Sequence, residues 1–225
     1  MLADDPGLAV LPRSDDLRGL RVGLVDELVG PRNRPAVLAR LAVFVERLRS
    51  QGVDVVPVSI PLGGRALSTY MSITSAASVP SLTPYVETGL AGPEVVRRHQ
   101  IGLRLRNEGR GELLEALRDQ QVLRRQTFAA LDRCDLLISP AMPTTAPLLE
   151  GPVSPEDLAD PMAAPYTDCW TVIANLAGLP AISLPSGLSA DDSMPVGVML
   201  CGRPGADRLL LRVAAALELE NAAGG

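Results

Sequence analysis

The sequence contains no lysine, because all 21 of its basic residues are arginine. Arginine stays protonated at any working pH, whereas a catalytic lysine must be able to lose its proton. This absence excludes any mechanism that needs a lysine base within this chain. The single histidine, His99, also excludes a histidine-rich zinc site and makes a Ser-His-Asp triad depend on one residue.

Cysteine is scarce too: Cys134, Cys169 and Cys201 lie far apart and form no Cys-x-x-Cys pair. We therefore expect free, buried thiols in a reducing compartment. The first residues are acidic and do not resemble a secretory signal, and no apolar run approaches the ~20 residues that span a bilayer. These features predict a cytoplasmic protein without a membrane partner.

Several common functional motifs are missing. The formal net charge is −5 and the arginines are scattered, so there is no basic stripe for direct nucleic-acid binding. There is no Walker loop, no Gly-x-Gly-x-x-Gly after a strand, no His-Glu-x-x-His and no Gly-x-Ser-x-Gly. The sequence predicts neither a cofactor nor a metal site.

The residues that are present indicate an α/β fold. With 225 residues, 47% of them hydrophobic, the chain can bury one sizeable core or two small ones. A short branched stretch at 20–25, a helical periodicity at 35–50 and a second branched stretch at 53–60 form a strand-helix-strand pattern. This pattern predicts parallel pairing of the two strands.

The remaining elements follow from periodicity, proline and glycine. We expect helices at 65–78, 94–105, 112–134, from Thr167 or Asp168 to Ala177, and at 206–220, and strands at 135–139, 181–185 and 196–202. A Pro/Thr loop occupies 140–147. The expected architecture is a mixed sheet flanked by helices over 17–220, with a loose tail at 1–16 and a frayed tail at 221–225.

Four blocks of sequence carry a family resemblance. They are Asp16-Leu-Arg-Gly-Leu-Arg-Val-Gly23, Asp135-Leu-Leu-Ile-Ser-Pro with Pro143-Thr-Thr, Asp160 to Gly187 with its Asn175-Leu-Ala-Gly-Leu-Pro180 core, and Met194 to Ala216. Their order and spacing resemble the carboxy-terminal portion of the amidase signature family over about residues 15–219. The resemblance implies the amidase-signature α/β fold.

The resemblance also implies what this chain lacks. Family members use a serine nucleophile, a second serine in a cis peptide and a lysine, and all three precede the portion that resembles this chain. We therefore assign no catalytic residue here. The resemblance implies that this chain is the carboxy-terminal part of an amidase-signature hydrolase. The whole enzyme would act on carboxamide C–N bonds by hydrolysis or amidotransfer, and this chain alone would be inactive. A chain carrying the amino-terminal amidase half, or self-association, is the implied partnership.

Within the family, the sequence is most similar to the amidase subunit of glutamine-dependent tRNA amidotransferases. Arg97-Arg98-x-x-Ile101-Gly102 matches that subunit's Arg-Arg-x-x-Leu-Gly. The match implies that Arg98 binds the substrate's α-carboxylate and Asp168 its α-amino group, with their charged groups within about 10 Å of each other. Thr144 joins them as a substrate-binding residue, because its loop leaves the carboxyl end of a strand.

Alternatives remain open for each of these assignments. Asp168 also stands where a helix N-cap belongs, and Arg98 could be a solvated helix residue. The stretch Gly109-Arg-Gly-Glu-Leu-Leu114 replaces the subunit's tyrosine-rich segment, which leaves glutamine as the substrate open. For the whole chain, the alternative is a stand-alone, non-catalytic module derived from an amidase that binds a small ligand or regulates an enzyme. A further alternative is that the chain comes from a truncated reading frame or is a piece of a longer enzyme.

Overall fold

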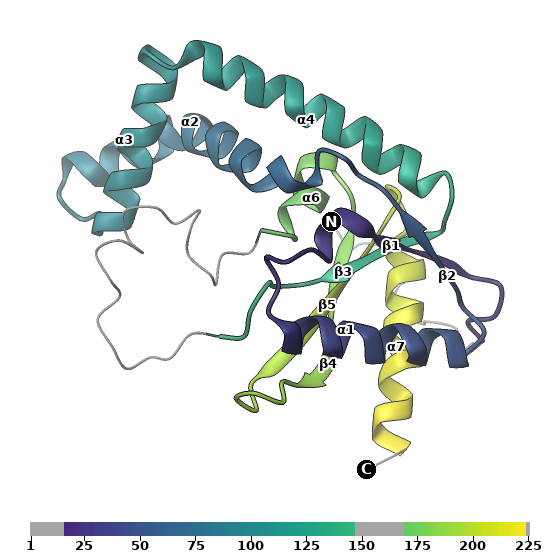
Figure 1. The fold of residues 1–225 in the computed structure, drawn as a ribbon. Helices are drawn as coiled ribbons and strands as arrows, with labels where there is room; N and C mark the ends of the chain where they lie inside the picture. Colours follow the sequence, from purple (N-terminus) through teal and green to yellow (C-terminus); the bar gives the residue numbers. More distant parts are fainter. Residues whose placement is uncertain (1–15, 147–168, 224–225) are drawn as a thin grey trace.

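The computed structural model describes residues 16–146 and 169–223, with side chains up to Leu217. Its centre is one five-stranded sheet with the order β2-β1-β3-β5-β4. The strands are β1 (Arg21–Val25), β2 (Asp54–Val58), β3 (Leu136–Pro140), β4 (Ala181–Leu188) and β5 (Pro195–Gly202). The mixed sheet flanked by helices confirms the predicted fold class (Figure 1).

The first half of the sheet is parallel. Strand β1 continues through a short 3-10 turn, Asp26–Leu28, to helix α1 (Pro35–Ser50), and β2 follows. Pro35 occupies the first helical position of α1, where its missing N–H removes no hydrogen bond. Strand β1 then pairs in parallel with both β2 and β3. The predicted strand-helix-strand unit is therefore confirmed.

The second half of the sheet is antiparallel. Strand β5 pairs with β3 on one side and with β4 on the other. A β-bulge between Pro185 and Gly187 shifts the register of β4, and Gly187 has φ +98°. Both predicted strands are found, and β4 runs three residues beyond its expected end.

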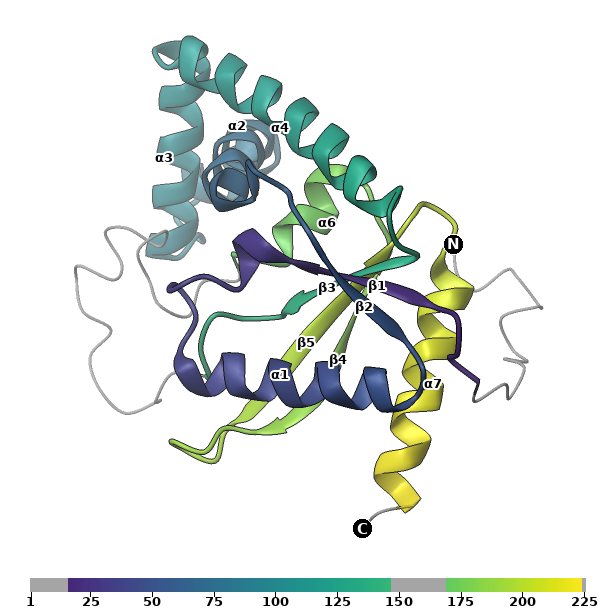
Figure 2. The same ribbon diagram turned by 45° about the vertical axis from the view of Figure 1, so that its right-hand side comes forward.

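Two hydrophobic layers cover the sheet. Helices α1 and α7 (Asp207–Ala223) lie against one face, where Phe44, Leu48, Leu200 and Val213 are among the buried residues (Figure 2). Helices α2 (Ala66–Glu87), α4 (Arg110–Leu131) and α6 (Val172–Ala177) supply the layer on the other face, which contains Trp170. The sheet and the helices on its two faces thus form three layers, and the loops that join them lie at the ends of the strands.

Helix α2 is longer than the sequence indicated. It was expected to end near Ser78, yet it continues through Pro80 and Pro84 to Glu87. Pro80 has no N–H for the carbonyl of Ala76, four residues earlier. Arg106 supplies the missing donor, since its Nη1 lies 3.2 Å from that carbonyl oxygen. A contact from α3 (Pro93–Asn107) thus compensates for the proline.

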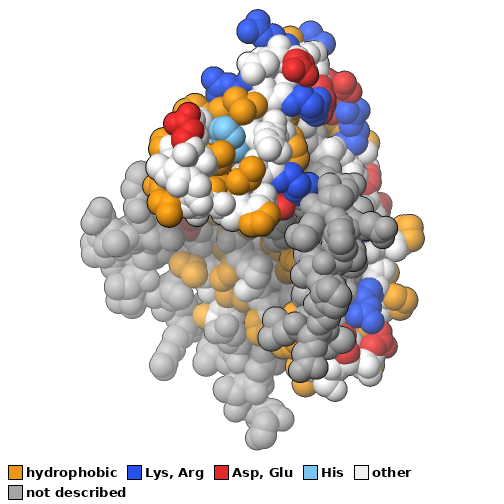
Figure 3. Space-filling view, turned by 90° about the vertical axis from the view of Figure 1, so that its left-hand side faces the viewer, with side chains coloured by type: hydrophobic (Ala, Val, Ile, Leu, Met, Phe, Trp, Pro, Cys, Tyr) orange, Lys and Arg blue, Asp and Glu red, His pale blue; other side chains and the backbone are white. Residues whose placement is uncertain are grey.

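The α2–α3 end of the molecule exposes large hydrophobic side chains. Tyr85, Leu90 and Val95 are exposed around the turn between the two helices. Figure 3 shows this end, with orange hydrophobic side chains over α2 and α3 and mostly charged ones above them. Helix α4 follows α3 directly and returns across the sheet to β3.

The last two helices differ from expectation at their ends. Helix α6 begins at Val172, later than predicted, and both expected cap residues lie outside the described residues. It ends as predicted, because Gly178 adopts the left-handed conformation at φ +71°. Helix α7 runs to Ala223 rather than Glu220. The domain boundaries at 16 and 221 stay predictions.

Candidate functional site

The carboxyl ends of the parallel strands β1, β2 and β3 carry the candidate site. Loops at this edge of an α/β sheet are where ligands usually bind. Glu27, just after β1, accepts hydrogen bonds from the hydroxyl of Ser59 and from the backbone N–H of Ile60 at 2.7 Å. This carboxylate therefore ties the segment after β1 to the segment after β2.

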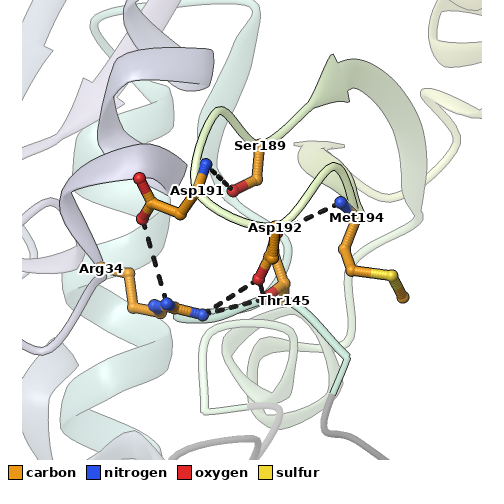
Figure 4. Close-up of polar contacts among 6 residues, drawn as sticks. All are labelled: Arg34, Thr145, Ser189, Asp191, Asp192 and Met194. Atoms are coloured by element: carbon orange, nitrogen blue, oxygen red, sulfur yellow. Dashed lines mark hydrogen bonds and ion pairs between the residues drawn. The ribbon is translucent and has the colours of Figure 1, made fainter.

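The Pro/Thr loop after β3 is held by Arg34. The backbone N–H of Arg34 donates to the carbonyl of Pro143 at 2.8 Å. Its guanidinium donates to Thr145 Oγ1 at 3.1 Å and to Asp192 Oδ2 at 3.2 Å. The Thr145 hydroxyl in turn donates to Asp192 at 2.7 Å (Figure 4). One arginine thus joins the loop after β3 to the β4–β5 hairpin.

The Asp192 carboxylate serves this contact as a permanent anion. The Thr145 hydroxyl, the backbone N–H of Met194 and Ser189 all donate to it, and Arg34 adds its charge. Together they lower the pKa of Asp192 to about 2. A group that holds its charge so firmly is suited to positioning the loop and not to accepting a proton near neutral pH.

A hollow of about 370 Å³ opens beside this loop. Thr144, Thr145 and Met142 line it from the loop, and Val196 and Gly197 line it from β5. Thr144, predicted as a substrate-binding residue, is thus placed at the wall of a cavity. The site can offer a threonine hydroxyl in a mainly apolar recess, which suits the orientation of a small organic ligand.

Trp170 is anchored to the segment between β1 and α1. Its indole N–H donates to Asn33 Oδ1 at 2.7 Å, and Asn33 Nδ2 donates to the carbonyls of Leu28 at 2.9 Å and Gly30 at 3.0 Å. Both side chains are buried. The sequence analysis assigned no role to Asn33. Two buried polar groups far apart in sequence give no periodic signal that would pair them.

Arg98 belongs to α3, and its side chain reaches α2. It is half-buried, and its Nη2 donates to Thr74 Oγ1 of α2 at 2.7 Å. Its neighbour Arg97 pairs with Glu94 on the same helix at 3.0 Å. Arg98 is therefore bonded to a neighbouring helix, yet it does not line the hollow beside Thr144. Asp168 lies outside the described residues, so the shared cleft stays a prediction.

Neither His99 nor the cysteines line the hollow beside Thr144. His99 is buried, and its Nε2 lies 2.8 Å from the Thr83 hydroxyl, in contact with α2. Burial raises the pKa of Cys134 to about 11 and that of Cys201 to about 12. Both are neutral thiols at physiological pH and are poor nucleophiles. Cys134, Cys169 and Cys201 are all buried and form no disulfide, as predicted.

Another hollow lies at the opposite end of the sheet, at the amino ends of its parallel strands. It measures about 790 Å³ and is lined by charged residues, among them Arg21, Asp54, Asp132 and Arg203. Arg21 pairs with Asp54 at 3.1 Å, and Arg203 pairs with Asp132. Because these charges neutralise one another, this hollow offers no focused charge for a ligand. Within residues 16–146 and 169–223, no group of three potential metal ligands gathers, and no helix could cross a membrane.

Comparison with known proteins now identifies the family. The family model described as Amidase matches residues 6–211. The chain belongs to the amidase family. The four sequence blocks predicted this membership, and the sheet and helices described above are its framework.

Three individual proteins show how similar this chain is to known relatives in sequence and in fold. The chain is 35% identical to a glutamyl-tRNA(Gln) amidotransferase subunit of Rhodococcus erythropolis, over 90% of this chain and 45% of that protein. The crystal structure of the same subunit from Thermotoga maritima is 27% identical, with a TM-score of 0.68 over 91% of this chain and 43% of that one. A vestigial complex related to an s-triazine catabolic enzyme shares the fold at 23% identity and a TM-score of 0.74. The chain thus spans about half the length of the curated relatives that it matches.

Proposed function

We propose that this chain is the carboxy-terminal part of an amidase-signature hydrolase and is catalytically inactive alone. The observation that carries the proposal is the family match over 6–211 in a chain without lysine, which spans 45% of a 35%-identical relative. The serine nucleophile and the lysine belong to the other part of the fold. Another polypeptide segment supplies them, and the serine attacks the amide carbonyl.

The chain's own contribution is one wall of the substrate pocket. Thr144 faces a small hollow, and the fork of Arg98 is of the kind that binds a carboxylate through two hydrogen bonds. Asp168 binds the ammonium group of the same substrate. The substrate class is therefore an amino acid with a side-chain carboxamide, and ammonia is the leaving group. Three buried cysteines that form no disulfide favour the reducing cytoplasm as its location.

Activity in the presence and absence of the missing part tests this proposal. The purified chain is incubated with glutamine, asparagine and propionamide, first by itself and then together with the amino-terminal half of the Rhodococcus erythropolis amidotransferase relative. We expect no ammonia above a buffer blank from either part alone, and release from the mixture. Saturable turnover by this chain alone that survives repurification contradicts the proposal, as does a mixture that stays inactive.

The role of Arg98 is tested in the active mixture. Replacing Arg98 with methionine removes the carboxylate-binding fork and should raise the KM for glutamine or asparagine about tenfold or more, because hydrogen bonds to charged groups contribute about 1.5–3 kcal/mol. Propionamide has no α-carboxylate, so its KM should not change. Arg97→Met is the matched control, since Arg97 pairs with Glu94. An equal effect of Arg98→Met on all three amides would refute the assignment.

A further inference from the structure

The hollow beside Thr144 has two walls that come from distant segments. Met142, Thr144 and Ala146 belong to the Pro/Thr loop after β3, whereas Val196 and Gly197 belong to β5. Apart from the threonine hydroxyls, the side chains in both walls are apolar. A recess of this kind suits the methylene groups of a ligand better than a charged group.

Backbone pairing holds the two walls together at one end of the hollow. Strand β3 pairs with β5 as far as Pro140, which lies opposite Val198. The N–H of Ala141 continues this pairing, because it donates to the carbonyl of Gly197 at 3.0 Å. Among the described residues, no further backbone hydrogen bond joins 142–146 to β5. Side chains therefore set the distance between the walls beyond Ala141.

Arg34 and Asp192 supply the side-chain contacts that do this (Figure 4). The backbone N–H of Arg34 holds the carbonyl of Pro143, and its guanidinium donates to both Thr145 and Asp192. The Thr145 hydroxyl also donates to Asp192 at 2.7 Å. The other carboxylate oxygen of Asp192 accepts the N–H of Met194 at 3.1 Å, directly before β5 begins. The loop is thus tied to the start of the strand that forms the opposite wall.

The contact is a network and not an isolated surface ion pair. An exposed arginine–aspartate pair contributes little by itself. Here Thr145 is buried and bonded to both charged groups, and hydrogen bonds to charged groups are stronger than neutral ones. Ser193, beside Asp192, has φ +56°, a left-handed conformation that is unfavourable for serine and persists where surrounding contacts hold it. The network therefore fixes the hairpin as well as the loop.

We propose that Arg34 and Asp192 are positioning residues that hold the Pro/Thr loop against β5, and that the recess between these walls binds the methylene groups of an aliphatic amide. This inference rests on the proposed function, because it names the part of the substrate that this wall of the pocket binds. Of the residues that the structure describes, those lining the hollow do not include Arg34 or Asp192. Both act through Thr145 and not by touching the substrate.

The test measures how kcat/KM depends on the length of the substrate. Acetamide, propionamide, butyramide and pentanamide are compared in the mixture of this chain with the amino-terminal half of the Rhodococcus erythropolis amidotransferase relative. With both walls in place, each added methylene group should raise kcat/KM up to about fourfold, which corresponds to its full burial. In Arg34→Met and in Asp192→Ala the loop can move away from β5, and the increment should fall below about twofold.

This readout separates positioning from stability. A variant that is merely less stable loses activity on every amide by the same factor, and its increment for each methylene group does not change. Asp191→Ala is the matched control for Asp192→Ala, since Asp191 lies 3.9 Å from Arg34 and its Oδ2 is at the edge of the network. Arg49→Met is the control for Arg34→Met, because Arg49 pairs with Glu46 on the surface of the same helix. Circular dichroism checks that each variant folds, and Asp192→Ala decides the question if Arg34→Met does not.

The expected result is a reduced increment in Arg34→Met and Asp192→Ala and the native increment in both controls. If the native mixture is active but these two variants keep the native increment, the positioning role is wrong and the proposed function stands. An active native mixture without any dependence on chain length overturns the assignment of the recess, and an equal loss in Asp191→Ala overturns the role of Asp192. If the native mixture is inactive on every amide, the proposed function fails and this inference falls with it.

Discussion

Replacing Gly102 with alanine tests the close contact between α2 and α3 that positions Arg98. A Cβ at Gly102 would lie 2.2 Å from the carbonyl oxygen of Ser75 and 2.6 Å from Cγ2 of Val79. The first obstacle is helix backbone, which cannot rotate away as a long side chain can. The two helices must therefore separate, and the hydrogen bond between Arg98 and Thr74 spans the same interface.

The magnitude follows from two opposing effects. Overpacking a tight interface destabilises by about 1–3 kcal/mol, and a backbone obstacle puts Gly102 at the upper end. Alanine is a better helix former than glycine by about 1 kcal/mol, which offsets part of this. The net expectation is a loss of about 2 kcal/mol, or roughly 4–8 °C in Tm for a chain of this size.

The matched control is Gly111→Ala in α4, where an added Cβ meets nothing within 4 Å. There the helix preference acts alone, and stability should rise by up to about 1 kcal/mol. Urea unfolding followed by circular dichroism measures both variants. If Gly102→Ala is as stable as Gly111→Ala, the contact between the two helices is looser than the structure indicates and the reasoning is refuted.

Two further predictions concern buried groups. Trp170→Phe leaves the buried Asn33 Oδ1 without its donor and should destabilise by about 1–3 kcal/mol in urea unfolding, whereas an unchanged midpoint would show that the hydrogen bond contributes nothing. The raised pKa values of Cys134 and Cys201 predict a loss of stability at alkaline pH. The unfolded thiols ionise from about pH 8.5, whereas the folded thiols keep their protons until about 11. Between these pH values the unfolded state binds fewer protons, so the free energy of unfolding falls as the pH rises. The urea concentration at the unfolding midpoint should fall as the pH is raised from about 9 to 11, and it should fall less in the double variant Cys134→Ala/Cys201→Ala. Equal slopes of midpoint against pH in the two proteins would contradict the assignment.

Much of the fold was determined by local sequence pattern. The periodicity of 35–50 between two branched stretches predicted the parallel β1-α1-β2 unit, because the repeat of buried residues differs between helices and strands. Gly178 predicted the end of α6, because a left-handed residue there suits glycine best. The four sequence blocks indicated the family, and the absence of lysine excluded a lysine base from this chain.

Tertiary structure decided what depends on groups distant in sequence. Helix α2 continues through Pro80 because Arg106 of another helix supplies a donor, and a local rule could not include that donor. The network of Arg34, Thr145 and Asp192 joins three segments, and each of its residues is unremarkable within its own segment. Among the described residues, β4 pairs with β5 alone, and a β-bulge between Pro185 and Gly187 shifts their register. Sequence sets each element's preferences, whereas hydrogen bonds and pairing edges are fixed when distant elements are brought together.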